Sequence, residues 1–262
     1  MAELLFWPAL LAYGEAAVAY LGEVRNPGLA GRLATWGVRI GWLVQTALLV
    51  VQATRAEGFP WTDWAGSLNL FIWLVVGAYL IWGCQARFRL LGLAVMPLAA
   101  VLFAVAHAAG GTDTGSAARY STLFLVLHVG LVSAAFAGFT LAAALSGLYL
   151  WQERRLKRHS TSLFRLYAPP LAALDRLAAR TVLVALPAFT LGIAAGFVRL
   201  QRRGGSLDVL MEITLVTWTV YGSFLLLRFG RGWQGRRAAY LALAGFVLVA
   251  VLRLALPGGH FS

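Results

Sequence analysis

Stretches of about 20 apolar residues recur along this chain of 262 residues, and a helix needs about that many to cross the roughly 30 Å hydrocarbon layer of a bilayer. Hydrophobic residues make up 60% of the sequence and charged residues only 12%, whereas a soluble domain carries about 25% charged residues. The pattern therefore predicts an all-α integral membrane protein.

Eight apolar stretches predict a bundle of eight transmembrane helices that forms a single membrane domain over residues 1–262. The predicted helices cover residues 4–21, 33–53, 67–84, 90–109, 121–151, 181–200, 209–227 and 238–256. The first stretch lacks a basic leader and a small-residue cleavage site, so we predict a helix there and not a signal peptide. The longest connection, 152–180, has apolar residues at helical spacing after Pro169 and Pro170, which predicts a short interfacial helix.

Basic residues are concentrated in the odd-numbered loops between the predicted helices. These loops contain Arg25, Arg32, Arg87, Arg89, Arg154, Arg155, Lys157, Arg158, Arg165, Arg176, Arg180, Arg228, Arg231, Arg236 and Arg237. Because short cytoplasmic loops are enriched in Lys and Arg, we expect these loops in the cytoplasm and both termini on the outer side. The net charge is +12, but the basic residues lie between apolar spans and not in one soluble patch. The charge therefore does not indicate a nucleic-acid partner.

Two sets of residues in the predicted outer loops are candidates for ligand binding. Arg199, Arg202 and Arg203 lie on the side where the orientation rule disfavours them. They are either a tolerated local cluster or a site for an anionic group. Trp61 and Trp64 lie in the second outer loop, where they form either an aromatic wall for a flat ligand or part of the ordinary interfacial belt of tryptophans.

Three of the four histidines approach the predicted outer face. His107 ends the fourth predicted helix, His128 lies early in the fifth and His260 follows the eighth. In a continuous helix His128 stands roughly 35 Å from Trp151, which places it at the outer interface and not in the middle of the membrane. Neutral imidazole is a common ligand for metals, including haem iron. A structural role, with the ring hydrogen-bonded to a neighbouring helix, is the alternative for each histidine.

Several segments resemble a known family. They are LHVGLVSAAFAGFTLAAALSGLYLWQERRLK from Leu127, LDRLAARTVLVALPAFTLGIAAGF from Leu174, TWTVYGSFLLLRFGRGWQGRRAAYLALAGF from Thr217 and, less closely, GFPWTDWAGSLNLFIW from Gly58. The chain is similar to members of the cytochrome c assembly family, which includes CcsA, CcmC and the shorter HemX and YpjD-like proteins. In length and in its LxxLDRL loop it most resembles the short HemX and YpjD-like members.

The resemblance implies a haem site at the outer face. His128 and His260 match the family's two outer histidines, with His107 as an alternative ligand. Non-covalent b-type haem is the implied cofactor, and Arg199, Arg202 and Arg203 are the implied partners of its propionates. The tryptophan-rich segment of the family is mostly lost, because only Asp208 and Trp218 of it are kept. The family's two transmembrane histidines correspond to Gln45 and Leu226, and neither side chain binds haem iron as imidazole does.

Two functions follow from the resemblance. One is binding or presenting haem at the outer face for cytochrome c maturation, with a ResB-like membrane protein or apocytochrome c as partner. The other is a HemX-like regulator or scaffold that acts through the basic loop 152–180 on an enzyme of haem biosynthesis. The implied location is the cytoplasmic (inner) membrane of a bacterium. The sequence has a single cysteine, Cys84, and no nucleotide-binding or hydrolase motif, so at most we expect one component of a haem-attachment system.

Overall fold

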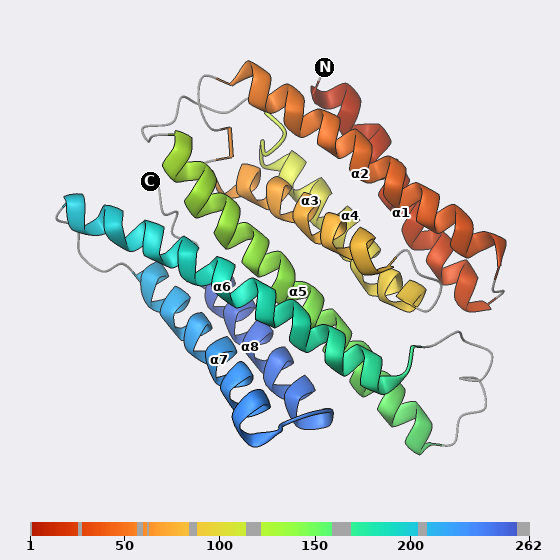
Figure 1. Cartoon of the computed structure of the whole chain (residues 1–262). Coiled ribbons are helices and arrows are strands. Elements are labelled where there is room, and N and C mark those ends of the chain that lie inside the picture. The colour runs from red at the N-terminus through yellow and green to blue at the C-terminus, as the bar shows by residue number, and fades with distance from the viewer. Residues whose placement is uncertain are drawn as a thin grey trace. The chain divides into compact units, whose positions relative to one another are not determined.

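A computed structural model gives the structure of this chain (Figure 1). It describes residues 2–25, 28–56, 60–61, 63–83, 88–113, 122–158, 169–203 and 209–255. All regular structure within these ranges is helical, and the helices are α1 (Ala2–Arg25), α2 (Leu29–Arg55), α3 (Trp64–Gly83), α4 (Arg89–Ala108), α5 (Thr122–Lys157), α6 (Leu171–Arg203), α7 (Val209–Arg231) and α8 (Arg236–Ala255). The predicted all-α fold is therefore confirmed for the described part of the chain.

Seven of these helices, α1 to α7, are long and apolar enough to cross a membrane. Each predicted transmembrane helix corresponds to one observed helix, and the eighth, α8, has 20 residues. The chain is therefore a multi-pass membrane protein. The orientation, with both termini on the outer side, stays a prediction.

The connection between α5 and α6 is shorter than predicted. α5 has 36 residues and continues to Lys157, while α6 has 33 residues and begins directly after Pro170. Pro170 has no N–H to donate, but its carbonyl accepts hydrogen bonds from Ala173 and Leu174 at 2.8 and 3.2 Å. The residues expected to form a separate interfacial helix are thus the first turns of α6, which continues without a break into the membrane span.

The contacts between residues divide the chain into two compact units, and each is described by itself. Unit 1 comprises residues 1–122 and 158–169, and unit 2 comprises residues 123–157 and 170–262. Unit 1 therefore contains α1 to α4, and unit 2 contains nearly all of α5 together with α6 to α8. The single membrane domain expected over residues 1–262 stays a prediction.

In unit 1, α1 and α2 approach each other closely because α2 has glycines where they meet. A Cβ atom added to Gly41 would lie 2.6 Å from the ring of Tyr13 on α1, and one added to Gly37 would lie 3.0 Å from the carbonyl of Ala12. Small residues at such contacts allow helices to pack in lipid, where no hydrophobic force drives them together.

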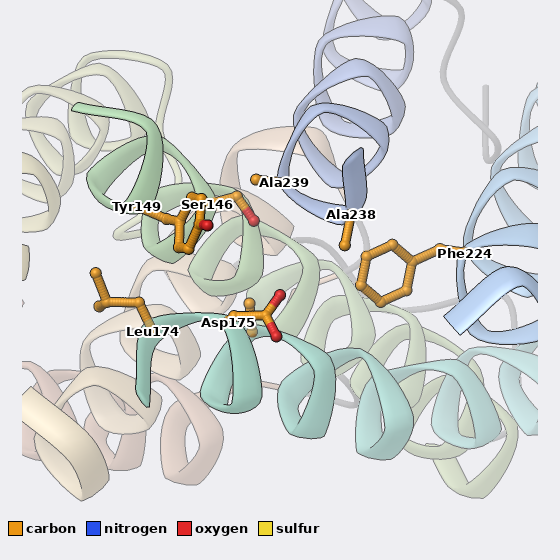
Figure 2. Close-up of a pocket in the computed structure, with 8 residues that line it drawn as sticks. Ser146, Tyr149, Leu174, Asp175, Phe224, Ala238 and Ala239 are labelled. Carbon is orange, nitrogen blue, oxygen red and sulfur yellow. The ribbon is translucent and has the colours of Figure 1, made fainter. Parts of the chain in front are cut away.

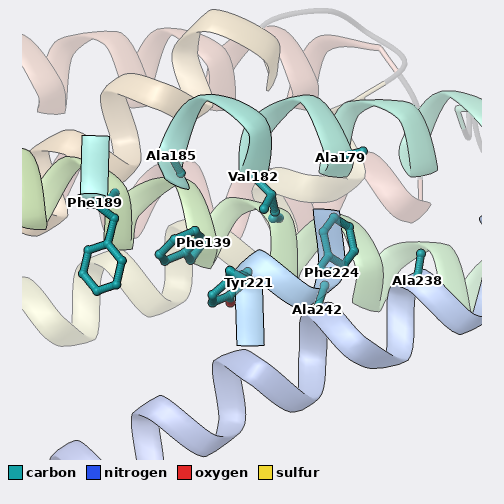
Figure 3. Packing of buried hydrophobic residues seen from close by; sticks show 11 residues of the cluster. Phe139, Ala179, Val182, Ala185, Phe189, Tyr221, Phe224, Ala238 and Ala242 are labelled. Atoms are coloured by element: carbon teal, nitrogen blue, oxygen red, sulfur yellow. The ribbon is translucent and has the colours of Figure 1, made fainter. Parts of the chain in front are cut away.

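In unit 2, the core combines stacked aromatic rings with alanines. Phe139 of α5 and Tyr221 of α7 stack with their centroids 3.8 Å apart and their planes 5° from parallel. Figure 3 shows the buried cluster, which comprises Ala135, Phe139, Ala142, Ala179, Val182, Ala185, Phe189, Tyr221, Phe224, Ala238 and Ala242. The alanines let α6 and α8 approach the rings closely, and this packing fixes the helices that carry the functional residues.

Candidate functional site at the His128 end of unit 2

His128 lies in the second turn of α5 and contacts α6. Its Nδ1 lies 2.8 Å from the backbone carbonyl oxygen of Gly192, and its ring is stacked on Phe124 at 5.4 Å. A carbonyl oxygen can only accept a hydrogen bond, so Nδ1 carries the proton and donates it. The lone pair of the neutral ring therefore belongs to Nε2, and a metal would bind at that nitrogen.

Two glycines one turn apart on α6 make room for this ring. A Cβ atom added to Gly196 would lie 2.9 Å from Cε1 of His128 and 3.2 Å from its Nδ1, and one added to Gly192 would lie 2.7 Å from Cγ2 of Val132. A side chain at position 196 would push the imidazole away from α6, and one at position 192 would push Val132 of α5 away. The resemblance of the TLG segment to the family does not indicate these contacts, although the i, i+4 spacing of Gly192 and Gly196 could have.

The same segment of α6 connects to α7. Thr190 accepts a hydrogen bond from Nε1 of Trp218 at 2.9 Å and donates one to the carbonyl of Leu186 at 2.9 Å. Residues 190–192 thus contact α7 through a hydroxyl and α5 through a carbonyl. Trp218, which the resemblance matches to the family's tryptophan-rich segment, forms a hydrogen bond between α7 and α6 in this structure.

The predicted anion-binding arginines follow on the same helix. Arg199, Arg202 and Arg203 belong to the last turns of α6, and Arg203 is seven residues beyond Gly196, about 10 Å along the axis. They therefore continue beyond the histidine toward the predicted outer face, although their side chains lie outside the described residues. Asp208 and His260 also lie outside the described residues, so their assignment to a haem site stays a prediction.

His107 lies in unit 1 at the end of α4. Its ring stacks on Phe6 of α1 with the centroids 3.6 Å apart, and its Nδ1 is 2.7 Å from the hydroxyl of Thr112. A hydroxyl can donate or accept, so this contact does not select one tautomer. His107 and His128 belong to different units, and they are considered separately.

Trp61 and Trp64, also in unit 1, differ in their surroundings. Trp61 is half-buried and donates from Nε1 to Oε1 of Gln52 at 3.2 Å. Trp64 begins α3 and is 56% exposed. One tryptophan is therefore part of the internal hydrogen bonding, whereas the other has the exposure typical of the interfacial belt. A haem-binding role for either stays a prediction.

Buried amides form a network through unit 1. Tyr13 donates to Gln45 Oε1 at 2.7 Å, and Gln45 Nε2 donates to Asn69 Oδ1 at 2.8 Å. Asn69 Nδ2 then donates to Oε1 of Gln52 and to the carbonyl of Gly111, each at 3.1 Å. Gln45, Gln52 and Asn69 are all fully buried. Gln45, which corresponds to a transmembrane histidine of the family, is thus committed to bonds within the protein.

The opposite end of unit 2 contains a partly buried ion pair. Asp175 of α6 accepts two hydrogen bonds from Arg228 of α7, at 3.0 and 2.8 Å. The same carboxylate accepts the backbone N–H of Gly235 at 2.9 Å. Gly235 has a φ of 66°, a conformation that favours glycine. The LDRL and RGWQGRR motifs are therefore joined by one carboxylate, a contact that the sequence did not reveal.

A small cavity adjoins this ion pair, and Figure 2 shows Ser146 and Tyr149 of α5, Asp175 of α6 and Phe224 of α7 around it. The cavity has a volume of about 10 Å³, which is near the minimum that one water molecule needs. The cavity is far too small for a porphyrin. Among the described residues, no group of three or more His, Cys, Asp or Glu side chains could hold a metal ion.

Comparison with known proteins extends over most of the chain. Residues 61–256 match the family model of the Cytochrome C assembly protein. The cytochrome c biogenesis protein CcsA of Microcystis aeruginosa is 27% identical, over 85% of this chain and 83% of that protein. CcsA of Prochlorococcus marinus is 28% identical over 92% and 88% of the two chains, and CcsA of Mesostigma viride is 25% identical over 94% and 88%.

Proposed function

We propose that this chain, which belongs to the cytochrome c assembly protein family, binds haem at the outer end of unit 2 and presents it for cytochrome c maturation. Membership of the family confirms the resemblance found in the sequence and supports a role in cytochrome c maturation. Presentation of haem at the outer face is the finer proposal. Haem is here the cargo of the protein.

One observation carries this proposal, namely the hydrogen bond from His128 Nδ1 to the carbonyl of Gly192. A ligand histidine almost always donates its other ring N–H to a carbonyl, carboxylate or water, which fixes the tautomer and orients the ring. His128 has this arrangement, and the ring is further held by Phe124 and by the surface at Gly196. These contacts support His128 as one axial ligand through Nε2.

The remaining residues of the proposed site come from the sequence. Haem supplies an iron that accepts imidazole ligands and two propionates that pair with arginine. His260 is proposed as the second axial ligand, with His107 as the alternative, and Arg199, Arg202 and Arg203 are proposed as partners of the propionates. Asp208 is proposed to border the site, and a haem-binding role of Trp61 and Trp64 stays a prediction. Apocytochrome c or a ResB-like protein is the proposed partner.

A second function is favoured by the residues at the family's transmembrane histidine positions. Gln45 is saturated with hydrogen bonds, and Leu226 is 75% exposed and apolar. A haem site at these positions is therefore not supported, although the outer site does not depend on it. A HemX-like regulator that binds no haem, and acts through its basic cytoplasmic loop on an enzyme of haem biosynthesis, is the corresponding alternative.

Absorbance spectroscopy of the purified full chain in detergent tests these alternatives. We expect a haem Soret band, either as purified or after haem is added. His128→Ala should lower haem affinity at least tenfold, because removing an axial ligand removes an iron–nitrogen bond. His260→Ala and His107→Ala test the two candidates for the second ligand. His159→Ala is the matched control, since it removes an imidazole from the predicted cytoplasmic connection 152–180.

A colourless protein that does not take up added haem would overturn the proposal and favour the regulatory alternative. Equal loss of haem in His128→Ala and His159→Ala would overturn the assignment of His128. Thermal unfolding of each variant must be compared with the parent chain, so that loss of a ligand is separated from loss of the fold.

A further inference from the structure

Two arginines from different helices of unit 2 meet at one tyrosine. Arg236 Nη2 at the start of α8 donates to the hydroxyl of Tyr240 at 3.3 Å, and its guanidinium lies 5.4 Å from the centre of the same ring. Arg154 near the end of α5 lies close enough to this hydroxyl to interact with it electrostatically. All three side chains are exposed. We name these residues, Arg154, Arg236 and Tyr240, the arginine–tyrosine site.

The charges around this site favour an anion. The nearby carboxylate of Glu153 is already engaged by Lys157 at 2.8 Å, and Asp175 is engaged by Arg228 at 2.8 Å. Two guanidinium groups near one neutral hydroxyl repel each other, so an anion between them would be stabilised. The planar guanidinium matches the oxygens of a phosphate, and the phenol can donate a hydrogen bond to the same group.

The surface beside the site matches a lipid molecule. Tyr240, Ala244, Val247 and Val251 follow one another at spacings of four, three and four residues, so they line one stripe of α8, and all four are exposed. Arg236 begins this stripe, with a charged group at the helix end and apolar groups further along. A phospholipid has the same order, with its phosphate at the surface and its acyl chains at greater depth.

Aromatic residues place this end of unit 2 at the depth of lipid headgroups. Arg155 lies 4.5 Å from the ring of Trp151, and Arg237 lies 6.0 Å from the ring of Trp233. Tryptophan and tyrosine gather at the membrane interface, and basic pockets between helices on the cytoplasmic side bind anionic lipid headgroups. The described residues therefore combine cations, aromatic rings and an apolar stripe in the order that a lipid requires.

We propose that the arginine–tyrosine site binds the phosphate of an anionic phospholipid whose acyl chain lies along the Tyr240–Val251 stripe of α8. The site is independent of haem, because it lies at the opposite end of unit 2 from His128. Its expected effect is to hold the ends of α5 and α8 together and to prefer an anionic leaflet. A lipid bound there would connect residues that are 82 positions apart in the sequence.

Lipid binding to the purified full chain tests the proposal, with native mass spectrometry in detergent counting phosphatidylglycerol and phosphatidylcholine separately. We expect the parent chain to prefer phosphatidylglycerol. The double variant R154Q/R236Q should bind it at least tenfold more weakly, since each cation near an anionic surface contributes roughly a fivefold step. The matched control R176Q/R180Q removes two exposed cations of α6 in unit 2 but none from the site, and it should keep most of the preference. Tyr240→Phe removes only the hydroxyl and should weaken binding by a smaller factor.

Each remaining outcome decides against the proposal. Equal weakening in R154Q/R236Q and R176Q/R180Q would mean that only the general charge attracts lipid. Inorganic phosphate, added without lipid, should not stabilise the chain through these residues, and if it did the ligand would be free phosphate and not a lipid. Thermal unfolding in a neutral detergent verifies that each variant is folded before its lipid binding is compared.

Discussion

Unit 1 and unit 2 connect their helices through different kinds of polar contact. In unit 1 a network of neutral amides and a phenol runs from Tyr13 through Gln45 and Asn69 to Gln52. In unit 2 the ion pair of Asp175 and Arg228 lies near one end of the helices, and His128 lies near the other. Along α6, Asp175 and Gly192 are separated by 17 residues, or about 25 Å.

This difference follows from the cost of charge in a bilayer. Ionised groups are expensive in the middle of the membrane and less so at its edges, where water and lipid headgroups are near. Neutral amides can be buried more deeply, provided that their donors and acceptors are satisfied. Unit 1 can therefore carry hydrogen bonds through its interior, whereas unit 2 fills its interior mostly with alanines and aromatic rings and keeps the charged pair of Asp175 and Arg228 near one end.

The largest expected effect concerns the ion pair of unit 2. Asp175→Asn removes the charge that balances Arg228, whose side chain is only 9% exposed, and weakens the acceptor for Gly235. We expect the free energy of unfolding to fall by about 3 kcal/mol, because breaking a buried pair leaves an uncompensated charge. Denaturant titration in mixed micelles would measure this change.

Glu153→Gln is the matched control for this prediction. It removes a carboxylate from the exposed pair with Lys157, and such pairs contribute less than about 1 kcal/mol. If both variants lost the same stability, the Asp175 pair would be no more important than a surface pair. The contrast between the two units would then no longer include a stabilising ion pair in unit 2.

A smaller effect is expected in the amide network of unit 1. Gln45→Leu keeps most of the volume but leaves the Tyr13 hydroxyl and the Asn69 side chain without their shared partner. Buried groups that lose a hydrogen bond cost roughly 1 to 3 kcal/mol, so we expect a loss of about 2 kcal/mol by the same denaturant titration. Thr54→Ala, at an exposed hydroxyl bonded only to its own helix, should change the stability far less; a similar change in both would contradict a cooperative network.

The smallest effect on stability is expected at the His128 end of unit 2. There we also expect a selective effect on ligand binding. In Gly196→Ala the new methyl group would meet the ring of His128, and the resulting overpacking should cost about 1 kcal/mol. Haem affinity should fall as the imidazole shifts. Absorbance titration with haem and thermal unfolding would measure the two effects.

Gly222→Ala provides the control, because a Cβ atom there would meet nothing within 4 Å. Alanine is a better helix former than glycine by about 1 kcal/mol, so this variant should be as stable as the parent chain or more stable, with unchanged haem binding. Destabilisation of similar size in both glycine variants would show that space beside His128 is not the reason for Gly196.

Much of the fold could be predicted because hydrophobic length is a local property. About 20 apolar residues specify a membrane helix wherever they occur, so each helix from α1 to α8 was expected close to its observed position. The ends were less predictable, since α5 extends past Trp151 and α6 begins at Leu171. Polar residues can continue a helix beyond the hydrocarbon layer, where composition no longer indicates its end.

The sequence by itself determined that this protein crosses a membrane with a bundle of helices, that it belongs among cytochrome c assembly proteins, and that His128 lies near one end of α5. These properties depend on composition, spacing and motif. Only the tertiary structure decided that Nδ1 of His128 meets Gly192, that Asp175 joins Arg228 to Gly235, and that Gln45 lies within a hydrogen-bonded network. Hydrogen bonds between helices depend on how the helices rotate and approach, and that arrangement results from the packing of the whole unit.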